Sequence, residues 1–298
     1  MASGVEQRRL GEFADIVKYD EPLAPYTFLK LGGPAELLVQ PRTRAELSAV
    51  VRRCTEERIP LRVLGGGCNV LVRDEGVKGA VLRLSEPAFT QLTGEGRRLR
   101  AGTGAALSAL ISHAARHALA GLETLVGIPG TVGGALRCNA GDRSGDIGQF
   151  VRLVEVLDGQ GEVQVRERDE LRFGYHWSNL DDPVLLAAEF ELEPDAADAL
   201  VKRMRKAWIL RKASQPLHFQ SAVRCFKNPR GLSAAALIEQ AGLAKTRVGG
   251  AEVSERDPSF LQVHPGGTAR DVLRLIDLVR SRLRERFDVE LELQITVW

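Results

Sequence analysis

The order of the predicted secondary-structure elements indicates an α+β protein. Strand-like and helix-like segments follow one another without the strict alternation that a doubly wound parallel sheet requires. A β-hairpin pattern around the turn Asp158-Gly159-Gln160-Gly161 adds antiparallel strands to this mixture. With 298 residues, the chain is long enough for about two domains. We therefore predict an α+β fold of two domains.

The chain before residue 120 carries the patterns of four strands and two helices. Apolar runs bounded by turn residues indicate strands, and apolar residues spaced three and four apart indicate amphipathic helices. A turn at Pro41 precedes the first helix. The strands are predicted at 35–39, 61–64, 79–84 and 97–101, and the helices at 45–58 and 105–119.

A long charged helix, predicted at 196–213, divides the rest of the chain. Before it lie the hairpin strands 151–157 and 162–168 and a strand at 184–192. After it we predict helices at 233–241 and 268–286 and a closing strand at 289–297. We place the boundary near residue 200, which gives an N-terminal segment of residues 1–20, one domain over 21–200 and a second over 201–298.

Composition and charge exclude several classes of protein. A net charge of +2 argues against a nucleic-acid surface, which needs a clustered basic face. No apolar run approaches the ~20 residues of a membrane helix, and the N-terminus lacks the apolar core of a signal peptide. Four widely spaced cysteines, with no cluster at metal-ligand spacing, indicate neither disulfides nor a metal site. We expect a soluble, cytoplasmic protein without a membrane or nucleic-acid partner, and its oligomeric state stays open.

Two glycine-rich loops point to a binding site for phosphate groups. The first, Leu64-Gly65-Gly66-Gly67-Cys68-Asn69, lies between apolar strands, and its glycines expose a row of backbone N–H groups suited to phosphate oxygens. The second runs from Gly127 through Gly134, with Asn139-Ala140-Gly141 after it. Neither loop has the spacing of a Rossmann or Walker A motif. Both could be tight turns of a twisted sheet, but two such loops beside one α+β region favour a dinucleotide pyrophosphate between them.

Several motifs in order along the chain resemble those of the UDP-N-acetylenolpyruvoylglucosamine reductases. The N-terminal ones are the stretch Tyr26–Ala35, the two glycine loops and Asn139-Ala140-Gly141. The C-terminal ones are Phe226-Lys227-Asn228-Pro229, the stretch from Leu237 to Gly242 and the stretch from Gly249 to Ser254. The resemblance covers nearly the whole chain from Tyr26 to Trp298.

The resemblance implies a two-lobed FAD-binding domain of the vanillyl-alcohol-oxidase type and a C-terminal α/β substrate-binding domain. It implies non-covalent FAD, NADPH as hydride donor, and reduction of UDP-N-acetylglucosamine enolpyruvate to the peptidoglycan precursor UDP-N-acetylmuramate. The short passage from Ser178 to Val201 matches the subgroup that lacks a tyrosine-bearing lid. The implied cofactor-binding residues are Leu64, Gly65, Gly66, Gly67, Cys68, Asn69, Gly127, Ile128, Pro129, Gly130, Thr131, Gly133, Gly134 and Asn139.

Three positions that carry catalysis in the family are substituted in this chain. The family's arginine in the motif Tyr-Arg-x-Ser is replaced by His176, which is charged only part of the time near neutral pH. The family's proton-donating serine or cysteine is replaced by Arg224, and arginine does not give up its proton in a protein. Cys225 lies one residue further on, where an extended strand would turn it to the opposite face. Either a local backbone shift brings its thiol into the site, or it is a buried, unreactive cysteine. The family's glutamate is replaced by Gln294, which can hydrogen-bond but cannot carry charge.

The resemblance also assigns candidate substrate-binding residues. Lys227 and Asn228 stand where the family contacts the phosphates and uracil region of the UDP-sugar, and Tyr175 and Arg211 lie in further substrate-proximal stretches. Three hypotheses stay open. The chain is an NADPH-dependent flavin reductase working with His176, Arg224, Cys225 and Gln294, or a catalytically impaired paralogue that binds FAD and UDP-sugar as a sensor or partner, or a flavin oxidase of another substrate.

Overall fold

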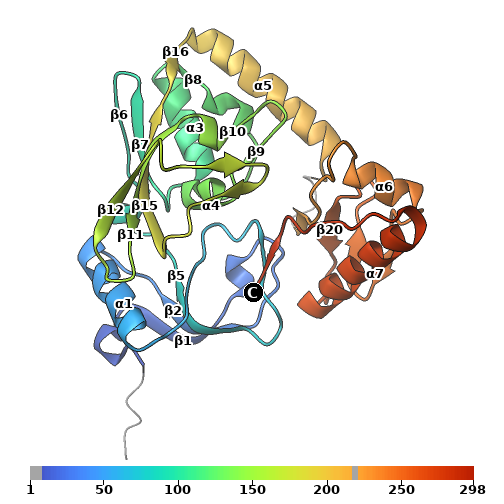
Figure 1. Ribbon diagram of the computed structural model, residues 1–298, viewed down its shortest axis with the longest axis horizontal. Coiled ribbons are helices and arrows are strands. Elements are labelled where there is room, and N and C mark those ends of the chain that lie inside the picture. The colour runs from blue at the N-terminus through green and yellow to red at the C-terminus, as the bar shows by residue number, and fades with distance from the viewer. Residues whose placement is uncertain (1–8, 217–220) are drawn as a thin grey trace, which may run out of the picture.

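The fold consists of three bodies, each built on its own β-sheet (Figure 1). The structure is a computed structural model, and it describes residues 9–216 and 221–298. Of these three larger sheets, two belong to the N-terminal part of the chain and the third to the C-terminal part; the described residues also form four two-stranded sheets. In the described parts of the chain, no helix is long and apolar enough to cross a membrane.

The first lobe is built from β1 (Val17–Pro22), β2 (Pro34–Val39), α1 (Arg44–Glu56), β3 (Leu61–Val63) and β5 (Val77–Leu82). Its sheet has the strand order β1-β2-β5-β3, in which β1 runs antiparallel to β2 and the other neighbours are parallel. Helix α1 begins after Thr43, whose side-chain oxygen accepts a hydrogen bond from the Glu46 N–H. Its apolar face packs into the core beside the sheet, as the predicted periodicity requires.

The second lobe is built from α2 (Pro87–Thr90), β6 (Leu92–Glu95), β7 (Arg98–Gly102), α3 (Leu107–Arg116), α4 (Val132–Arg137), β11 (Val151–Leu157), β12 (Val163–Glu167) and β15 (Val184–Glu191). Its five strands are antiparallel in the order β12-β11-β15-β7-β6. The predicted hairpin is confirmed: the Asp158 carboxylate accepts hydrogen bonds from the N–H groups of Gln160 and Glu162 and closes the turn. Helices α3 and α4 share one core with the sheet.

The C-terminal body is built from β17 (Ala222–Arg224), α6 (Ala234–Gln240), β18 (Arg247–Val248), β19 (Ala251–Val253), β20 (Phe260–Val263) and α7 (Ala269–Phe287). Its antiparallel sheet has the order β17-β20-β19-β18. Helix α7 begins with a capping box, because the side chains of Thr268 and Asp271 each accept a hydrogen bond from the other residue's N–H. The buried face of α7 completes the core of this body.

Two connections join the C-terminal body to the rest. Helix α5 (Ala197–Ser214) runs from the second lobe to the C-terminal body (Figure 1). The chain end then returns to the first lobe, where β21 (Thr296–Val297) pairs in parallel with β4 (Val70–Leu71). Near this strand pair the Asp74 carboxylate accepts hydrogen bonds from the Ala269 and Arg270 N–H groups at 2.9 and 3.0 Å, and so caps α7 across the junction.

Short elements shape the loops between these parts. They are β8 (Leu119–Ala120), β9 (Gly141–Asp142), β10 (Gly145–Asp146), β13 (Phe173–Gly174), β14 (Trp177–Ser178), β16 (Glu193–Pro194) and the 3₁₀ helices η1 (Gly11–Phe13), η2 (Ala24–Tyr26), η3 (Leu122–Leu125) and η4 (Ile147–Gln149).

The structure differs from the sequence predictions at both ends of the chain. The predicted closing strand over 289–297 is wrong in extent, since only Thr296–Val297 forms a strand. The residues before it cross between two bodies and make one isolated bridge, from Leu293 to Phe226. Within the predicted N-terminal segment 1–20, β1 already belongs to the first sheet, and residues 1–8 lie outside the described residues. The boundary at residue 200 falls within α5, and it stays our proposal.

Candidate functional site

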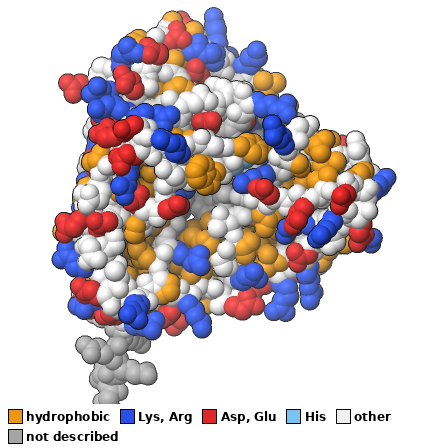
Figure 2. All heavy atoms as spheres, in the orientation of Figure 1, with side chains coloured by type: hydrophobic (Ala, Val, Ile, Leu, Met, Phe, Trp, Pro, Cys, Tyr) orange, Lys and Arg blue, Asp and Glu red, His pale blue; other side chains and the backbone are white. Residues whose placement is uncertain are grey.

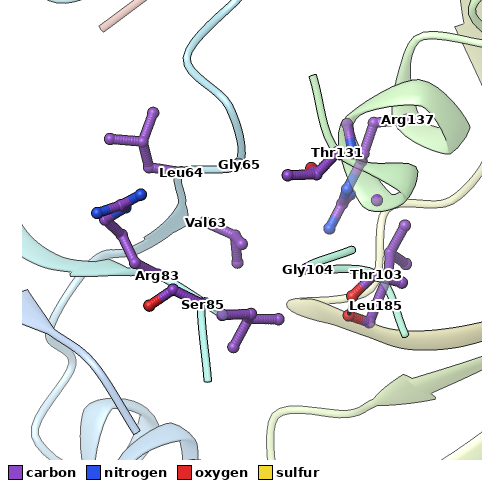
Figure 3. A pocket seen from close by; sticks show the side chains of 13 residues that line it. Val63, Leu64, Gly65, Arg83, Ser85, Thr103, Gly104, Thr131, Arg137 and Leu185 are labelled. Carbon is purple, nitrogen blue, oxygen red and sulfur yellow. Dashed lines mark hydrogen bonds between the residues drawn. The ribbon is translucent and has the colours of Figure 1, made fainter. Parts of the chain in front are cut away.

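A cleft of about 600 Å³ lies between the two N-terminal lobes (Figure 3). One wall comes from the first lobe and the segment that follows it, and the other from the second lobe, including the start of α4. In Figure 3 these two sets of side chains face each other across the opening. The lining residues are Val63, Leu64, Gly65, Arg83, Leu84, Ser85, Thr103, Gly104, Thr131, Gly133, Gly134, Arg137 and Leu185.

The two glycine loops touch each other at one end of this cleft. A Cβ atom added to Gly65 would lie 2.5 Å from the Thr131 Oγ1, and one added to Gly66 would lie 2.9 Å from the Gly130 Cα. Only glycine allows so close an approach of the two backbones. The prediction that both loops border one site therefore agrees with their placement.

The groups in the cleft suit a flat ligand with negative charges, such as FAD. Thr131 accepts a hydrogen bond from the Gly134 N–H at 3.3 Å, which fixes the turn into α4. The buried Nε of Arg83 has no hydrogen-bond partner among the described residues. On the opposite wall, Arg137 donates hydrogen bonds to the carbonyl oxygens of Leu180 and Asp182. Two guanidinium groups and a glycine-lined backbone are a donor set for phosphate oxygens.

The predicted cofactor residues divide into three groups. Leu64, Gly65, Thr131, Gly133 and Gly134 line the cleft. The others in the two loops form the turns behind it; they are Gly66, Gly67, Cys68, Gly127, Ile128, Pro129 and Gly130.

The two predicted asparagines hold the fold together instead of lining the cleft. Asn69 Nδ2 donates to the Gln294 carbonyl oxygen at 3.0 Å, across the junction of the domains. Asn139 donates to the Gly174 carbonyl oxygen at 2.8 Å and accepts from the Gly148 N–H at 3.0 Å. Their role as direct cofactor contacts stays a prediction.

Sequence reasoning missed several lining residues. Thr103 and Gly104 follow β7 directly, and the stretch Gly102-Thr103-Gly104 was a signal of a close backbone approach after a strand. Arg83 and Arg137 carried no such signal, because an arginine near a strand or helix end is usually a solvated surface residue. Their place in the cleft depends on the tertiary fold.

A second group of candidate residues lies where the second lobe meets the C-terminal body. Tyr175 and His176 form the two-residue turn between β13 and β14, and His176 has a positive φ of 50°. The two rings lie 4.4 Å apart between centroids. The Tyr175 hydroxyl accepts a hydrogen bond from the Asn228 N–H at 3.2 Å, so the hairpin tip contacts the C-terminal body. On the face drawn in Figure 2, hydrophobic side chains gather around the hollow between the bodies.

Arg224 and Cys225 point to opposite sides of their strand. Cys225 is fully buried in the C-terminal core, where burial raises the pKa of its thiol to about 12. The structure therefore agrees with the alternative of a buried, unreactive cysteine, and it does not support Cys225 as a catalytic group, because the thiol lies on the face of the strand that turns into the core. Arg224 faces away from that core, and its guanidinium donates to the Asp257 carboxylate at 2.9 Å and lies 5.0 Å from the Phe260 ring centroid.

Gln294 lies beside these residues and connects the two domains. Its N–H donates to the Cys225 carbonyl oxygen at 2.8 Å, and its own carbonyl accepts from Asn69. The side-chain Oε1 of Gln294 is buried and has no hydrogen-bond partner among the described residues. A buried acceptor without a donor is costly, so a ligand that supplies an N–H or O–H group fits this position. Lys227 pairs with the exposed Glu292 at 3.4 Å.

The other two predicted substrate-binding residues carry structural contacts. Arg211 is buried, and it donates to the carbonyl oxygens of Val126 and Thr124 and to the Asp142 carboxylate at 2.5 Å. These bonds fasten α5 to the second lobe, so the guanidinium is occupied by the protein itself. The Asn228 side chain accepts a hydrogen bond from the Ala234 N–H at 3.0 Å near the start of α6.

The electrostatics of the junction bear most on His176. Burial lowers the pKa of its imidazole below the usual 6.5, and the positive charges of Arg224 and Lys227 lower it further, while Asp146 opposes them. Arg224 and Lys227 therefore lie close enough to His176 for their charges to affect the imidazole. In the described residues, no group of His, Cys, Asp and Glu side chains is arranged to hold a metal ion.

Comparison with known proteins assigns both parts of the chain. Residues 35–166 match the family model of an FAD binding domain, and residues 215–298 match that of the UDP-N-acetylenolpyruvoylglucosamine reductase C-terminal domain. The predicted fold class is therefore confirmed, as a two-lobed FAD-binding domain followed by the C-terminal domain of this family.

Full-length relatives carry the same description. The chain is 41% identical over 280 residues to the UDP-N-acetylenolpyruvoylglucosamine reductase of Heliobacterium modesticaldum, covering 93% of this chain and 89% of the relative. It is 40% identical over 310 residues to that of Desulfosudis oleivorans, covering 100% and 99%. The crystal structure of the reductase from Thermus caldophilus superimposes with a TM-score of 0.81 and 38% identity over 93% of this chain and 97% of that one.

Proposed function

This chain belongs to the UDP-N-acetylenolpyruvoylglucosamine reductase family, and we propose that it reduces UDP-N-acetylglucosamine enolpyruvate to UDP-N-acetylmuramate with FAD and NADPH. The relatives cover nearly the full chain, and the FAD-binding domain and the family's C-terminal domain are both present. An intact pair of domains is what a reaction between a bound flavin and a bound UDP-sugar requires.

The observation that carries the proposal is the hydrogen-bonded link between the first glycine loop and the catalytic end of the chain. Asn69 Nδ2 donates to the Gln294 carbonyl at 3.0 Å, and the Thr296 N–H donates to the Asn69 carbonyl at 3.0 Å. The loop that borders the cofactor cleft and the segment that carries Gln294 are therefore neighbours. Cofactor and substrate would meet at this link, as a direct hydride transfer demands.

The chain's own residues would hold the cofactor between the lobes. The backbone around Gly65 and Gly133 would approach the pyrophosphate, and Arg83 and Arg137 would supply positive charge. When bound, FAD carries a hydride from NADPH to the substrate double bond. The walls of the cleft would exclude water from one face of the bound cofactor.

The substrate would lie between His176 on the second lobe and the segment Arg224–Asn228 of the C-terminal body. The substrate carries a carboxylate and two phosphates, and Arg224 and Lys227 supply positive charge at this position. The buried Oε1 of Gln294 would accept a hydrogen bond from a donor on the bound ligand. We also propose a cytoplasmic location, which the four free cysteines support, since reducing compartments keep thiols unpaired.

An anaerobic spectral titration tests the proposal. The protein is purified with its flavin, reduced with NADPH, and then mixed with the enolpyruvyl UDP-sugar while the visible flavin absorbance is followed. We expect the colour to bleach with NADPH and to recover with the substrate. A flavin that stays reduced after the substrate is added contradicts the proposed function.

One observation favours a second function, that of a ligand-binding protein without turnover. Arg224 stands where the family has its proton donor and cannot release a proton, and the thiol of Cys225 is sealed in the core. Under this alternative the protein binds FAD and UDP-sugar as a sensor or partner. The same titration separates the two: binding of the UDP-sugar perturbs the flavin spectrum, but the reduced flavin never returns its hydride.

A further inference from the structure

The proposed reduction needs a proton donor that the family motif no longer supplies. Adding a hydride to one carbon of the enolpyruvyl double bond leaves negative charge that must be met by a proton on the other carbon. The donor must lie near Gln294 and must be able to lose a proton near neutral pH. The side chains that meet at this junction are Tyr175, His176, Arg224 and Lys227.

Arg224 can hold charge in the site but cannot deliver a proton. Its guanidinium is fixed by Asp257 and stacked against Phe260, on the side of β17 that faces away from the core. A guanidinium keeps its proton at every pH that an enzyme meets. Arg224 is therefore suited to bind the substrate carboxylate and to stabilise the negative charge that develops next to it.

The neighbouring hydroxyl and thiol groups are also excluded. The Cys225 side chain is fully buried on the opposite face of the strand. The Ser178 hydroxyl is buried, and it donates its hydrogen to the Arg137 carbonyl oxygen at 3.0 Å. The Tyr175 hydroxyl oxygen accepts the Asn228 N–H, so it is held by the backbone of the C-terminal body.

His176 has the properties that the others lack. Its ring is half-buried, and in the part of the chain that the structure describes neither ring nitrogen forms a hydrogen bond. The left-handed backbone at the hairpin tip presents the ring beside Tyr175, next to the C-terminal body. Imidazolium loses its proton near neutral pH, and its protonated form is regained from solvent after each cycle.

We propose that His176 donates the proton in this chain and that Arg224, from the other domain, binds the substrate carboxylate. The inference rests on the proposed function. The carbon–carbon π bond breaks, one carbon receives the hydride that NADPH supplies through the flavin, and the other receives the ring N–H proton of His176. The imidazolium becomes a neutral imidazole, and a proton from solvent restores it. In the family motif, the arginine stands at position 176 and the proton donor at position 224 of the C-terminal domain. In this chain the cation, Arg224, lies in the C-terminal domain, and the proposed proton donor, His176, lies in the other domain.

The charges around His176 set the expected pH dependence. Burial lowers the pKa of His176, the charges of Arg224 and Lys227 lower it further, and Asp146 opposes them, while the Tyr175 ring lies against the imidazole. Below its pKa the imidazole is protonated and can act as an acid; above it the donor is missing. The rate of flavin reoxidation by the substrate should therefore fall as pH rises through a pKa below 6.5.

Stopped-flow measurement of the two half-reactions tests the proposal in the holoenzyme. We expect H176Q to slow flavin reoxidation by the substrate about 10²–10⁴-fold, the range of a lost general acid, and to leave flavin reduction by NADPH nearly unchanged. The control H117Q makes the same change at the exposed His117, which follows helix α3 in the second lobe, and should keep the wild-type rates. Because imidazole is gone, the pH dependence of reoxidation should flatten in H176Q only.

Arginine variants at position 176 test whether this residue must donate a proton or need only carry a positive charge. H176R keeps the positive charge but not the acid, so it should be as slow as H176Q, and the double variant H176R/R224S should recover much of the rate. If the wild type reoxidises and H176Q or H176R reoxidises equally fast, the inference is overturned but the proposed function stands. A loss of the pH-dependent step in Y175F instead of H176Q would assign the donor to Tyr175 and also overturn it. Wild type that never reoxidises overturns the proposed function itself.

Titration of His176 by nuclear magnetic resonance gives a readout that does not depend on activity. The ring signal of His176, identified by its loss in H176Q, is followed against pH in the oxidised holoenzyme with and without UDP-N-acetylmuramate. A carboxylate bound beside Arg224 should raise the pKa of His176 by offsetting the neighbouring positive charge. A pKa that is the same with and without the product contradicts this placement of His176.

Discussion

The cofactor cleft and the substrate junction of this protein are built in different ways. One end of the cofactor cleft is formed by the two glycine loops, where Gly65 and Gly66 lie against Thr131 and Gly130 with no space for a Cβ atom. The junction around Arg224 is formed by side chains whose charge and acidity decide the chemistry. On the resemblance of the sequence motifs, the first keeps the family pattern, and the second departs from it at His176, Arg224 and Gln294.

Under the proposed function, the difference indicates which part of a two-domain flavoprotein can change its chemistry and keep its ligand. Backbone N–H groups stay in place whatever side chains surround them, so a glycine cradle retains its donors as the sequence drifts. A side-chain site changes function with single substitutions, since serine, arginine and histidine differ in charge and in whether they release a proton. Substitutions made in one region at a time test whether the two regions differ in this way.

The largest effect is expected at the contact of the two glycine loops. In G65A the new Cβ would lie 2.5 Å from the Thr131 Oγ1, so the hydroxyl must leave its hydrogen bond to the Gly134 N–H. Overpacking costs about 1–3 kcal/mol and a lost helix cap about 1 kcal/mol of folding stability, so the loop that borders the cleft should lose its geometry and bind FAD more weakly. Fluorescence titration of the apoprotein with FAD measures this. The matched change G11A, where no atom lies within 4 Å, should bind FAD like wild type.

A smaller effect is expected where the first lobe caps helix α7. D74A removes the carboxylate that accepts the Ala269 and Arg270 N–H groups, and we expect it to lower the free energy of unfolding by roughly 1–2 kcal/mol. E75A is the control, because Glu75 makes only an exposed ion pair with Arg270 at 3.6 Å, a type of contact worth about 0–1 kcal/mol. Urea denaturation compares them, and equal losses in both variants would contradict the interdomain cap.

The smallest effect is expected at Cys225. Burial raises the pKa of this thiol to about 12, so the native protein should not be alkylated there by iodoacetamide at pH 8, where a catalytic thiolate would react. Mass spectrometry measures the alkylation of Cys225 in the native and in the guanidinium-unfolded protein. Alkylation in the unfolded protein alone shows that the fold protects this thiol. Rapid alkylation of Cys225 in the native state would make this residue a candidate proton donor again.

The sequence was sufficient for elements whose patterns are local. The periodicity of helix α1 and the turn at Asp158 predicted a helix and a hairpin, because each depends on residues close in the chain. The segment over 289–297 has the apolar texture of a strand but leaves one sheet for another, which no local pattern encodes. The structure alone placed the thiol of Cys225 in the core.

The same division holds for the candidate site. The glycine loops were predictable, since a row of glycines has a direct backbone consequence. Arg83 and Arg137 were not, because only the tertiary fold places these two arginines in one cleft. Arg211 was predicted to bind substrate, but it fastens α5 to the carbonyl oxygens of the second lobe. An arginine's partner depends on what the fold brings within its reach.

The central claim, that a rebuilt site still reduces the substrate, is tested most directly by one stopped-flow comparison. The reduced wild type and the variant H176R/V223G/R224S/Q294E, which restores the family residues, are each mixed anaerobically with the enolpyruvyl UDP-sugar. We expect both to reoxidise, and we expect the wild-type rate alone to fall with rising pH through the His176 titration. A wild-type flavin that stays reduced while the restored variant reoxidises would contradict the claim and would mark the native site as a binding site without turnover.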